Sequence, residues 1–309
     1  MTDYFSSLLE LRDRVVSYLL FPVSLVYSLL FIAKYYLSKP KKVNAKVICV
    51  GNVIVGGAGK TPVVQHLVQQ NEKCAIILRG YGGKLSGRKV VKVDPKKHTY
   101  LQVGDEALLH VKLAPTYICK NRYKAARAAC KDGAKTIIMD DGFQNFTLKK
   151  DHSILVFDTE YGIGNRMVLP SGRLREPLSF ARRRADELVL LSYDGNFKKP
   201  FEAKFTEYNV EVMNKQDVYG KSFIAMCGIA NPNKFFKSLT ESSVKILKKI
   251  IFVDHHSYST KEIEDVIKLA KELDVRIVTT SKDILKVPHK YRKSFVVLHI
   301  GLKKRQLMS

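Results

Sequence analysis

A glycine-rich run near the start of the chain, Gly56-Gly57-Ala58-Gly59-Lys60-Thr61, has the composition of a phosphate-binding loop. It follows the apolar segment 47–50 and precedes a segment typical of a helix. Glycines let successive backbone N–H groups and a helix N-terminus face an anion, and phosphates bind in this way. In such loops the lysine reaches the β and γ phosphates, and the threonine hydroxyl binds Mg²⁺. The order strand, loop, helix therefore predicts a nucleoside triphosphate site.

The loop departs from the G-x-x-x-x-G-K-[ST] pattern at one position. Ile54 occupies the place of the first glycine, so we expect Gly56 and Gly57 to make the turn instead. ATP with Mg²⁺ is the expected ligand. The predicted nucleotide-binding residues of the loop are Ile54, Val55, Gly56, Gly57, Ala58, Gly59, Lys60 and Thr61.

GTP is the alternative nucleotide, because Asn214-Lys215-Gln216-Asp217 matches the N-K-x-D motif that reads guanine. A GTPase also carries D-x-x-G after its second strand. Here Met139 stands three residues before Gly142, so that second element is absent and ATP is favoured.

Two carboxylates, Asp140 and Asp141, follow the apolar segment 136–139. Carboxylates at the end of such a strand hold or orient the metal ion of P-loop enzymes, although two acids there also occur as solvated loop residues. Ligands of parallel α/β sheets bind at the carboxyl ends of the strands, where both motifs end. We therefore expect these acids to lie near Thr61 and to bind Mg²⁺ with it.

A second pair of acids, Asp105 and Glu106, enters a helical run, where acids also simply complement the helix dipole. A kinase needs a carboxylate beside the γ-phosphate to accept the proton of the attacking hydroxyl. The run Asp254-His255-His256 follows the apolar segment 250–253, and a histidine there can tune or relay that proton; a solvated loop is the alternative. No third nitrogen or sulfur ligand stands at metal spacing, so no zinc site is expected.

Two further segments carry residue types that contact sugars and phosphates. Arg79-Gly80-Tyr81-Gly82-Gly83 directly follows an apolar segment, and the second segment is Gly172-Arg173-Leu174-Arg175-Glu176-Pro177. Glycines after a strand allow a ligand to approach closely, and arginine forms paired hydrogen bonds to phosphate. The predicted substrate contacts are Arg79, Tyr81 and Arg175, while Glu176 is a further candidate metal ligand.

Short apolar segments alternate with helical ones beyond residue 40, which favours a mostly parallel α/β sheet of the P-loop NTPase type. A Lys-rich stretch near 196–221 resembles a linker, and a smaller α/β alternation follows it. We therefore predict a P-loop core at 39–200, a linker at 201–220 and a second, smaller α/β domain at 221–309.

The segment 15–33 is almost wholly apolar. Its helical length would be about 28 Å, close to the thickness of a bilayer core. Cations lie on both sides of it, so they indicate no direction of crossing. We predict a membrane-associated helix at 1–38 that spans or lies in the bilayer; a buried helix of the core is the alternative.

The chain has 309 residues, with 53 Lys and Arg against 29 Asp and Glu, and a net charge of +24. Such a surface attracts nucleic acid, nucleotides, phosphorylated lipids or an anionic membrane. The five cysteines are scattered and form no C-x-x-C pair, which argues against a disulfide framework and favours a reducing cytosol.

Taken in order, these segments resemble the tetraacyldisaccharide 4'-kinase family, the lipid A 4'-kinases of Gram-negative bacteria. The resemblance departs from the family pattern at Ala230, Val253 and Ser281, all in the expected smaller domain. The segments that carry it are Gly51-Asn52 with 55–62, then 79–83, 103–107, 140–144, 174–177, 228–236 and Asp254-His255.

This resemblance implies transfer of the ATP γ-phosphate to the 4'-hydroxyl of a tetraacylated glucosamine disaccharide 1-phosphate, at the cytoplasmic face of the bacterial inner membrane. It implies Asp105 as the catalytic base, His255 as its partner and Lys60 as the phosphate-binding lysine. The implied metal ligands are Thr61, Glu106, Asp140, Asp141 and Glu176, and Gln144 is implied at the nucleotide.

The implied partners are the lipid A precursor and membrane lipids, with no nucleic acid and no obligate protein partner. The principal rival is a membrane-associated P-loop NTPase switch without a lipid acceptor. A basic nucleic-acid-binding protein is the non-enzymatic rival, supported only by the net charge.

Overall fold

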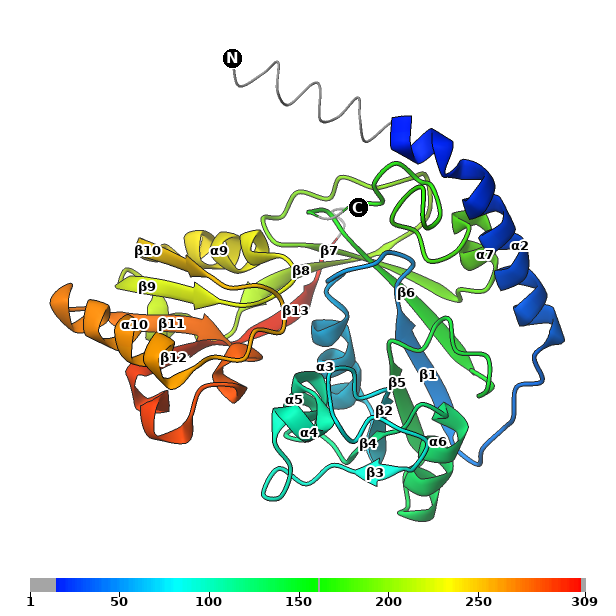
Figure 1. Cartoon of the computed structure of the whole chain (residues 1–309), viewed down its shortest axis with the longest axis horizontal. Coiled ribbons are helices and arrows are strands. Elements are labelled where there is room, and N and C mark those ends of the chain that lie inside the picture. Colours follow the sequence, from blue (N-terminus) through cyan, green and yellow to red (C-terminus); the bar gives the residue numbers. More distant parts are fainter. Residues whose placement is uncertain (1–14, 161, 307–309) are drawn as a thin grey trace.

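The computed structural model describes residues 15–160 and 162–306, which form two β-sheets covered by helices (Figure 1). The larger sheet has nine strands. Their order across the sheet is β13 (Ile300–Lys304), β8 (Thr206–Val212), β7 (Glu187–Ser192), β6 (His152–Asp158), β1 (Lys46–Gly51), β5 (Thr136–Asp140), β2 (Cys74–Leu78), β4 (Thr116–Ile118) and β3 (Val91–Lys92). Neighbours from β8 to β4 pair in parallel, whereas β13 and β3 are antiparallel edge strands.

Alternate residues of the central strands pack on opposite faces of this sheet. In β1, Ile48 and Val50 belong to one hydrophobic cluster, while Val47 and Cys49 belong to the other. Helices cover both faces, which is why these strands are apolar without interruption. The helices of this part of the chain are α3 (Lys60–Gln70), α4 (Tyr100–Val103), α5 (Asp105–His110), α6 (Arg122–Lys131) and α7 (Leu178–Arg183).

The smaller sheet has four parallel strands in the order β10 (Lys245–Ile251), β9 (Ser222–Cys227), β11 (Arg276–Thr280) and β12 (Phe295–Leu298). Its other elements are α8 (Lys215–Val218), α9 (Pro232–Glu241), α10 (Thr260–Glu272) and the 3-10 turns η1 (Asp283–Leu285) and η2 (His289–Ser294). The predicted fold class, a mostly parallel α/β core with a smaller α/β unit, agrees with this architecture.

The predicted boundaries differ from the structure in two places. The expected linker 201–220 contains β8, whose Val210 and Val212 are buried in the large sheet, and the expected domain 221–309 ends in β13 of that same sheet. Only His299 separates β12 from β13, so one extended run serves both sheets. These strands give weak patterns in the sequence, because β8 buries only alternate side chains at its end and β13 is an edge strand.

Helix α2 (Phe21–Leu37) lies beside α7 at the edge of the molecule away from the small sheet (Figure 1). Its buried residues are Ser24 and Ser28, and the Ser24 hydroxyl donates to the Val168 carbonyl at 2.9 Å. Phe31 and Tyr35 pack against Phe146 and Phe180, but most apolar side chains face outward, with Leu30 66% and Leu37 81% exposed. The alternative of a buried core helix is therefore wrong.

Within the described residues, no helix has the length and apolar composition needed to cross a membrane. The prediction of a spanning helix thus has no support in this part of the chain, because α2 contains 17 residues and begins only at Phe21. The first fourteen residues of the predicted segment 1–38 lie outside the described residues.

Candidate functional site

The glycine loop connects β1 to α3 and begins that helix at Lys60. Gly59 precedes the helix with φ of 74°, and a Cβ at this position would lie 2.8 Å from Leu191. Only glycine fits that backbone without strain. The Lys60 ammonium lies 3.3 Å from Asp141 Oδ1 and 3.3 Å from Asn52 Oδ1, so the lysine is directed toward the carboxyl ends of the central strands.

A cavity of about 1220 Å³ opens between the glycine loop and the smaller sheet. It brings together most of the residues predicted from the sequence. Those that line it are Val55, Gly56, Gly57, Ala58, Gly59, Lys60, Thr61, Arg79, Tyr81, Glu106, Asp140, Asp141, Gln144, Arg175 and His255. Ile54 does not line this cavity; it is 1% exposed and forms a β-bridge with Leu174. This arrangement does not support the prediction of Ile54 as a nucleotide-binding residue.

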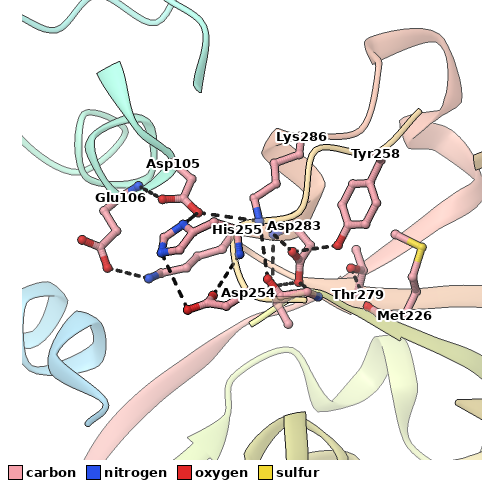
Figure 2. A network of polar contacts seen from close by, with 12 residues as sticks. Asp105, Glu106, Met226, Asp254, His255, Tyr258, Thr279, Asp283 and Lys286 are labelled. Carbon is pink, nitrogen blue, oxygen red and sulfur yellow. Dashed lines mark hydrogen bonds and ion pairs between the residues drawn. The ribbon is translucent and has the colours of Figure 1, made fainter. Parts of the chain in front are cut away.

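Asp105 begins α5 and meets His255 from the loop after β10. His255 Nδ1 lies 3.0 Å from Asp105 Oδ2, and the backbone N–H of Glu106 donates to the other oxygen at 2.8 Å. Figure 2 shows the two side chains facing each other across the two parts of the fold. The predicted pair thus forms from residues 150 positions apart.

The electrostatics of this pair favour charge on both partners. Burial alone would raise the pKa of Asp105, but the hydrogen bond from His255 and the charges of Lys282 and Lys286 hold it well below its usual range. The hydrogen bond to Asp105 raises the pKa of His255. His255 also has φ of 60°, an unusual conformation for a residue with a side chain. Such backbone strain often marks a functional site.

Of the Asp105–His255 pair, one residue lines the cavity. His255 lines it, whereas Asp105 has a side chain 6% exposed and does not. The neighbouring acid Glu106 does line it, and its carboxylate lies 2.7 Å from the ammonium of Lys282. Glu106, predicted as a metal ligand, is therefore engaged by a lysine of the smaller part.

Asp140 ends β5, and it is held by a histidine that sequence reasoning missed. His110 Nε2 lies 2.8 Å from Asp140 Oδ2, and both side chains are almost fully buried. Burial alone would raise the pKa of Asp140, but the hydrogen bond to His110 lowers it. The other oxygen, Oδ1, is buried and has no hydrogen-bond partner in the described part of the chain. An unpartnered carboxylate oxygen beside the cavity suits a divalent cation.

Asp141 follows with φ of 49° and accepts from Arg175 Nη1 at 3.1 and 3.2 Å. Burial would raise its pKa, but Lys60 and Arg175 together lower it. These contacts place Asp141 between the phosphate-binding lysine and a predicted substrate arginine.

The residues that fit Mg²⁺ are Thr61, Asp140 and Asp141, which line the cavity and carry hard oxygen ligands. No group of three or more His, Cys, Asp or Glu side chains in the described residues has metal-binding geometry. Glu176 is fully buried, does not line the cavity, and has its carboxylate bound by Arg184 and Gln144. The prediction of Glu176 as a metal ligand is not supported by this arrangement.

The remaining predicted contacts lie around the same cavity. Gln144 donates to the Asn52 carbonyl at 2.9 Å and to Glu176 at 3.0 Å, so it holds the residue that directly follows β1. Tyr81 is 69% exposed, and its ring centroid lies 5.8 Å from that of His255. These positions leave Tyr81 accessible to a ligand.

A lysine from the smaller part also reaches the glycine loop, and sequence reasoning missed it. Lys234 of α9 donates to the Gly57 carbonyl at 2.6 Å and pairs with Asp158 at the end of β6. Ala230 packs against the same loop. A Cβ added at Gly57 would lie 3.2 Å from the Cβ of Ala230. A buried lysine has no distinctive sequence signal, because its partner stands far along the chain.

The N-K-x-D match has a structural role. The Asn214 amide donates to the Val297 carbonyl at 3.0 Å and accepts from the His299 backbone at 2.9 Å, where the chain passes between the two sheets. It does not line the large cavity. The contacts therefore do not support the GTP alternative.

Comparison with known proteins is consistent with this geometry. Residues 16–307 match the family described as tetraacyldisaccharide-1-P 4'-kinase. A tetraacyldisaccharide 4'-kinase of Parvibaculum lavamentivorans is 39% identical over 88% of this chain and 82% of its own length. One from Paramagnetospirillum magneticum is 34% identical over 94% of this chain and 92% of its own.

A solved structure shares the fold as well as the sequence. The crystal structure of an apo form of LpxK from Aquifex aeolicus in complex with ATP has a TM-score of 0.75 and 28% identity, and covers 94% of this chain and 96% of that one. A match of this extent spans both sheets. The chain therefore belongs to the tetraacyldisaccharide-1-P 4'-kinase family and is an ATP-dependent phosphotransferase of lipid A biosynthesis.

Proposed function

We propose that the cavity binds ATP on the glycine loop and that the Asp105–His255 pair takes up the proton of the acceptor hydroxyl. The acceptor is the 4'-hydroxyl of a tetraacyldisaccharide 1-phosphate. The observation that carries this assignment is the 3.0 Å contact of the pair beside a cavity that also contains Lys60. A base must lie close to the acceptor, and a phosphate-binding lysine must lie close to the donor.

In this reaction the hydroxyl oxygen forms a bond to the γ-phosphorus, and the bond from that phosphorus to the bridging oxygen of ADP breaks. The hydroxyl proton passes to the Asp105–His255 pair. Lys60 neutralises charge on the transferred group, for which it exchanges its present contact with Asp141. Mg²⁺ bound by Thr61, Asp140 and Asp141 would supply further neutralisation of phosphate charge.

Two divisions of labour within the pair fit this geometry. In the first, Asp105 is the base and His255 supports it, as the family resemblance implies. In the second, His255 receives the proton because it lines the cavity, and Asp105 orients the imidazole. The pH dependence of kcat separates these two assignments. If the imidazole is the base, kcat falls as pH drops through the raised pKa of His255. If Asp105 is the base, kcat falls only at much lower pH.

The acceptor side of the cavity is assigned to Arg79, Tyr81 and Arg175. Arginine forms paired hydrogen bonds with phosphate, and an aromatic ring packs against a sugar face. Closure of the smaller part over the loop would exclude water, which a kinase needs in order not to hydrolyse ATP. This layout favours a kinase over the NTPase switch.

The outward apolar face of α2 is proposed to lie in the membrane that contains the acyl chains of the acceptor. Its serines pack inward on the protein, so the exposed residues Leu25, Leu29 and Leu30 remain available to lipid. The net charge of +24 favours an anionic bilayer surface. We infer that the helix lies in one leaflet and that the catalytic cavity stays on the cytoplasmic face.

One assay separates the kinase from the switch. Protein, Mg-ATP and tetraacyldisaccharide 1-phosphate in mixed micelles are expected to yield a lipid with a second phosphate and a matching amount of ADP. Phosphate release that is independent of lipid, with no phosphorylated lipid, would support the switch instead.

A further inference from the structure

A buried polar cluster of the smaller part of the fold lies next to Asp105 (Figure 2). Its centre is Asp283, which is fully buried at the start of η1. Asp283 accepts from the backbone N–H of Gly228 at 3.1 Å, from the Tyr258 hydroxyl at 2.8 Å and from the Thr280 hydroxyl at 2.8 Å. The fourth donor is Lys286 at 3.2 Å. Asp283 is thus held firmly in the smaller part of the fold.

Lys286 extends from this cluster toward the larger part. Its side chain is 2% exposed, and its ammonium lies 3.2 Å from Asp283 Oδ1 and 3.7 Å from Asp105 Oδ2. The Gly228 carbonyl lies 3.5 Å from the same nitrogen. A buried ammonium is costly unless acceptors surround it, and here the acceptors come from both parts. Lys286 therefore joins an anchored aspartate to the aspartate of the proposed base.

We propose that Lys286 is a positioning residue for phosphoryl transfer, which holds the Asp105 carboxylate toward His255 from across the interface. The His255 imidazole and the Lys286 ammonium both contact Asp105 Oδ2, while Oδ1 accepts a hydrogen bond from the Glu106 backbone N–H. Contacts on both oxygens fix the plane of the carboxylate. Catalytic groups need this restraint, because a small displacement reduces the rate strongly.

The position of Lys286 distinguishes it from the other cation of this segment. Lys282 lines the cavity and pairs with Glu106, whereas Lys286 is not among the described residues that line it. Lys286 thus reaches the reacting groups only through Asp105.

A purely structural role is a weaker explanation of this lysine. Asp283 keeps three other donors when Lys286 is replaced, so no buried carboxylate is left without hydrogen bonds. Removal of one partner of a buried ion pair is usually costly because it leaves a charge unpaired, but here the remaining donors to Asp283 limit that cost. We therefore expect Lys286→Met to fold.

The test is a double-mutant cycle on kcat with Lys286→Met and Asp105→Asn, and it rests on the proposed role of the Asp105–His255 pair. Lys286→Met is expected to lower kcat by about tenfold or more, within the contribution of a positioned base, with little change in the KM for ATP. In the Asp105→Asn background the same substitution should cause no further loss, because the two residues act as one unit. Lys286→Arg should recover part of the rate.

The matched control is Lys268→Met, which removes the same charge from the same part of the fold. Lys268 is 79% exposed on α10, and its partner Glu272 lies 4.0 Å away. This variant should keep the wild-type kcat. ATP binding and thermal unfolding of every variant are measured in parallel to establish folding.

Three results would overturn the proposal. They are a wild-type kcat in Lys286→Met, an equal loss in the wild-type and Asp105→Asn backgrounds, and failure of both Lys286→Met and Lys286→Gln to fold. Full activity of Asp105→Asn would instead remove the assignment of the base, and this proposal with it. An inactive Asp105→Asn beside a fully active Lys286→Met overturns this proposal alone.

Discussion

The reacting groups owe their properties to neighbours that are distant in the chain. Asp105 is ionised because His255 and two lysines surround it despite its burial. Lys60 is directed by Asp141 and Asn52. The chemistry of the site is thus set by contacts between residues rather than by the motifs one at a time.

Removal of the phosphate-binding lysine gives a first prediction. Lys60→Ala should lower kcat by at least about 10²-fold, because transition-state charge loses a preorganised cation. It should also weaken ATP binding, since the same ammonium contacts the bound phosphates. Steady-state kinetics and nucleotide titration measure the two effects, and unchanged ATP binding would show that the lysine is not at the phosphates.

His110 gives a second prediction, on stability. His110→Leu removes the hydrogen-bond partner of a buried Asp140 oxygen, and an unsatisfied buried acceptor costs about 1–3 kcal/mol. Urea unfolding should show a loss of this size, with partial recovery in His110→Gln. A wild-type midpoint in His110→Leu would mean that this contact does not hold Asp140 in solution.

The pH dependence of stability follows from the Asp105–His255 contact. The pKa of His255 is raised above 6.5 in the folded protein, so its contribution is fully present below about pH 6.5 and is lost as pH rises through the raised value. Asp105 remains charged throughout this window, because its pKa lies below 3.8. The difference in Tm between wild type and His255→Asn should therefore shrink as pH rises. A constant difference would contradict a charged pair.

At the scale of elements, the carboxyl ends of neighbouring strands bring the site residues together. The glycine loop follows β1, Asp140 ends β5, and Arg79 follows β2, so parallel pairing brings all three to one edge of the sheet. The sequence predicted this edge because each motif follows an apolar segment. His110 and Lys286 could not be predicted in this way, because nothing beside them in the sequence distinguishes them from surface residues.

For helix α2 the sequence predicted the function of the helix but not which of its residues are buried. Its apolar composition predicted membrane association, but the sequence could not show that Ser24 and Ser28 are its buried residues. Likewise β8 lies in a Lys-rich stretch and was expected as linker, since only Val210 and Val212 of that strand are buried. Elements that bury few of their side chains give weak hydrophobic patterns in the sequence.

The outward face of α2 gives a prediction for this element. Leu25→Glu with Leu29→Glu places two charges on residues that are 53% and 60% exposed, so folding should be unaffected. Binding to anionic phospholipid vesicles should fall, because charged side chains resist burial in lipid. Sedimentation with vesicles measures the effect. Equal sedimentation of the variant would show that α2 is not the membrane contact.

At the scale of the whole molecule, the site is divided between two sheets. The larger sheet carries the glycine loop and the aspartates, and the smaller one carries His255, Lys286 and Lys234. The chain crosses between them at 213–221 and again at His299, where Asn214 connects both crossings. Catalytic contacts that form only between two parts make chemistry depend on their closure.

The central claim is tested most directly by transfer of labelled γ-phosphate from ATP to tetraacyldisaccharide 1-phosphate by wild type, Asp105→Asn and His255→Asn. Both variants should bind ATP as wild type does but lose about 10²–10⁴-fold in kcat, the usual contribution of a positioned base. Phosphorylated lipid formed at the wild-type rate by folded Asp105→Asn protein would contradict this account of proton transfer.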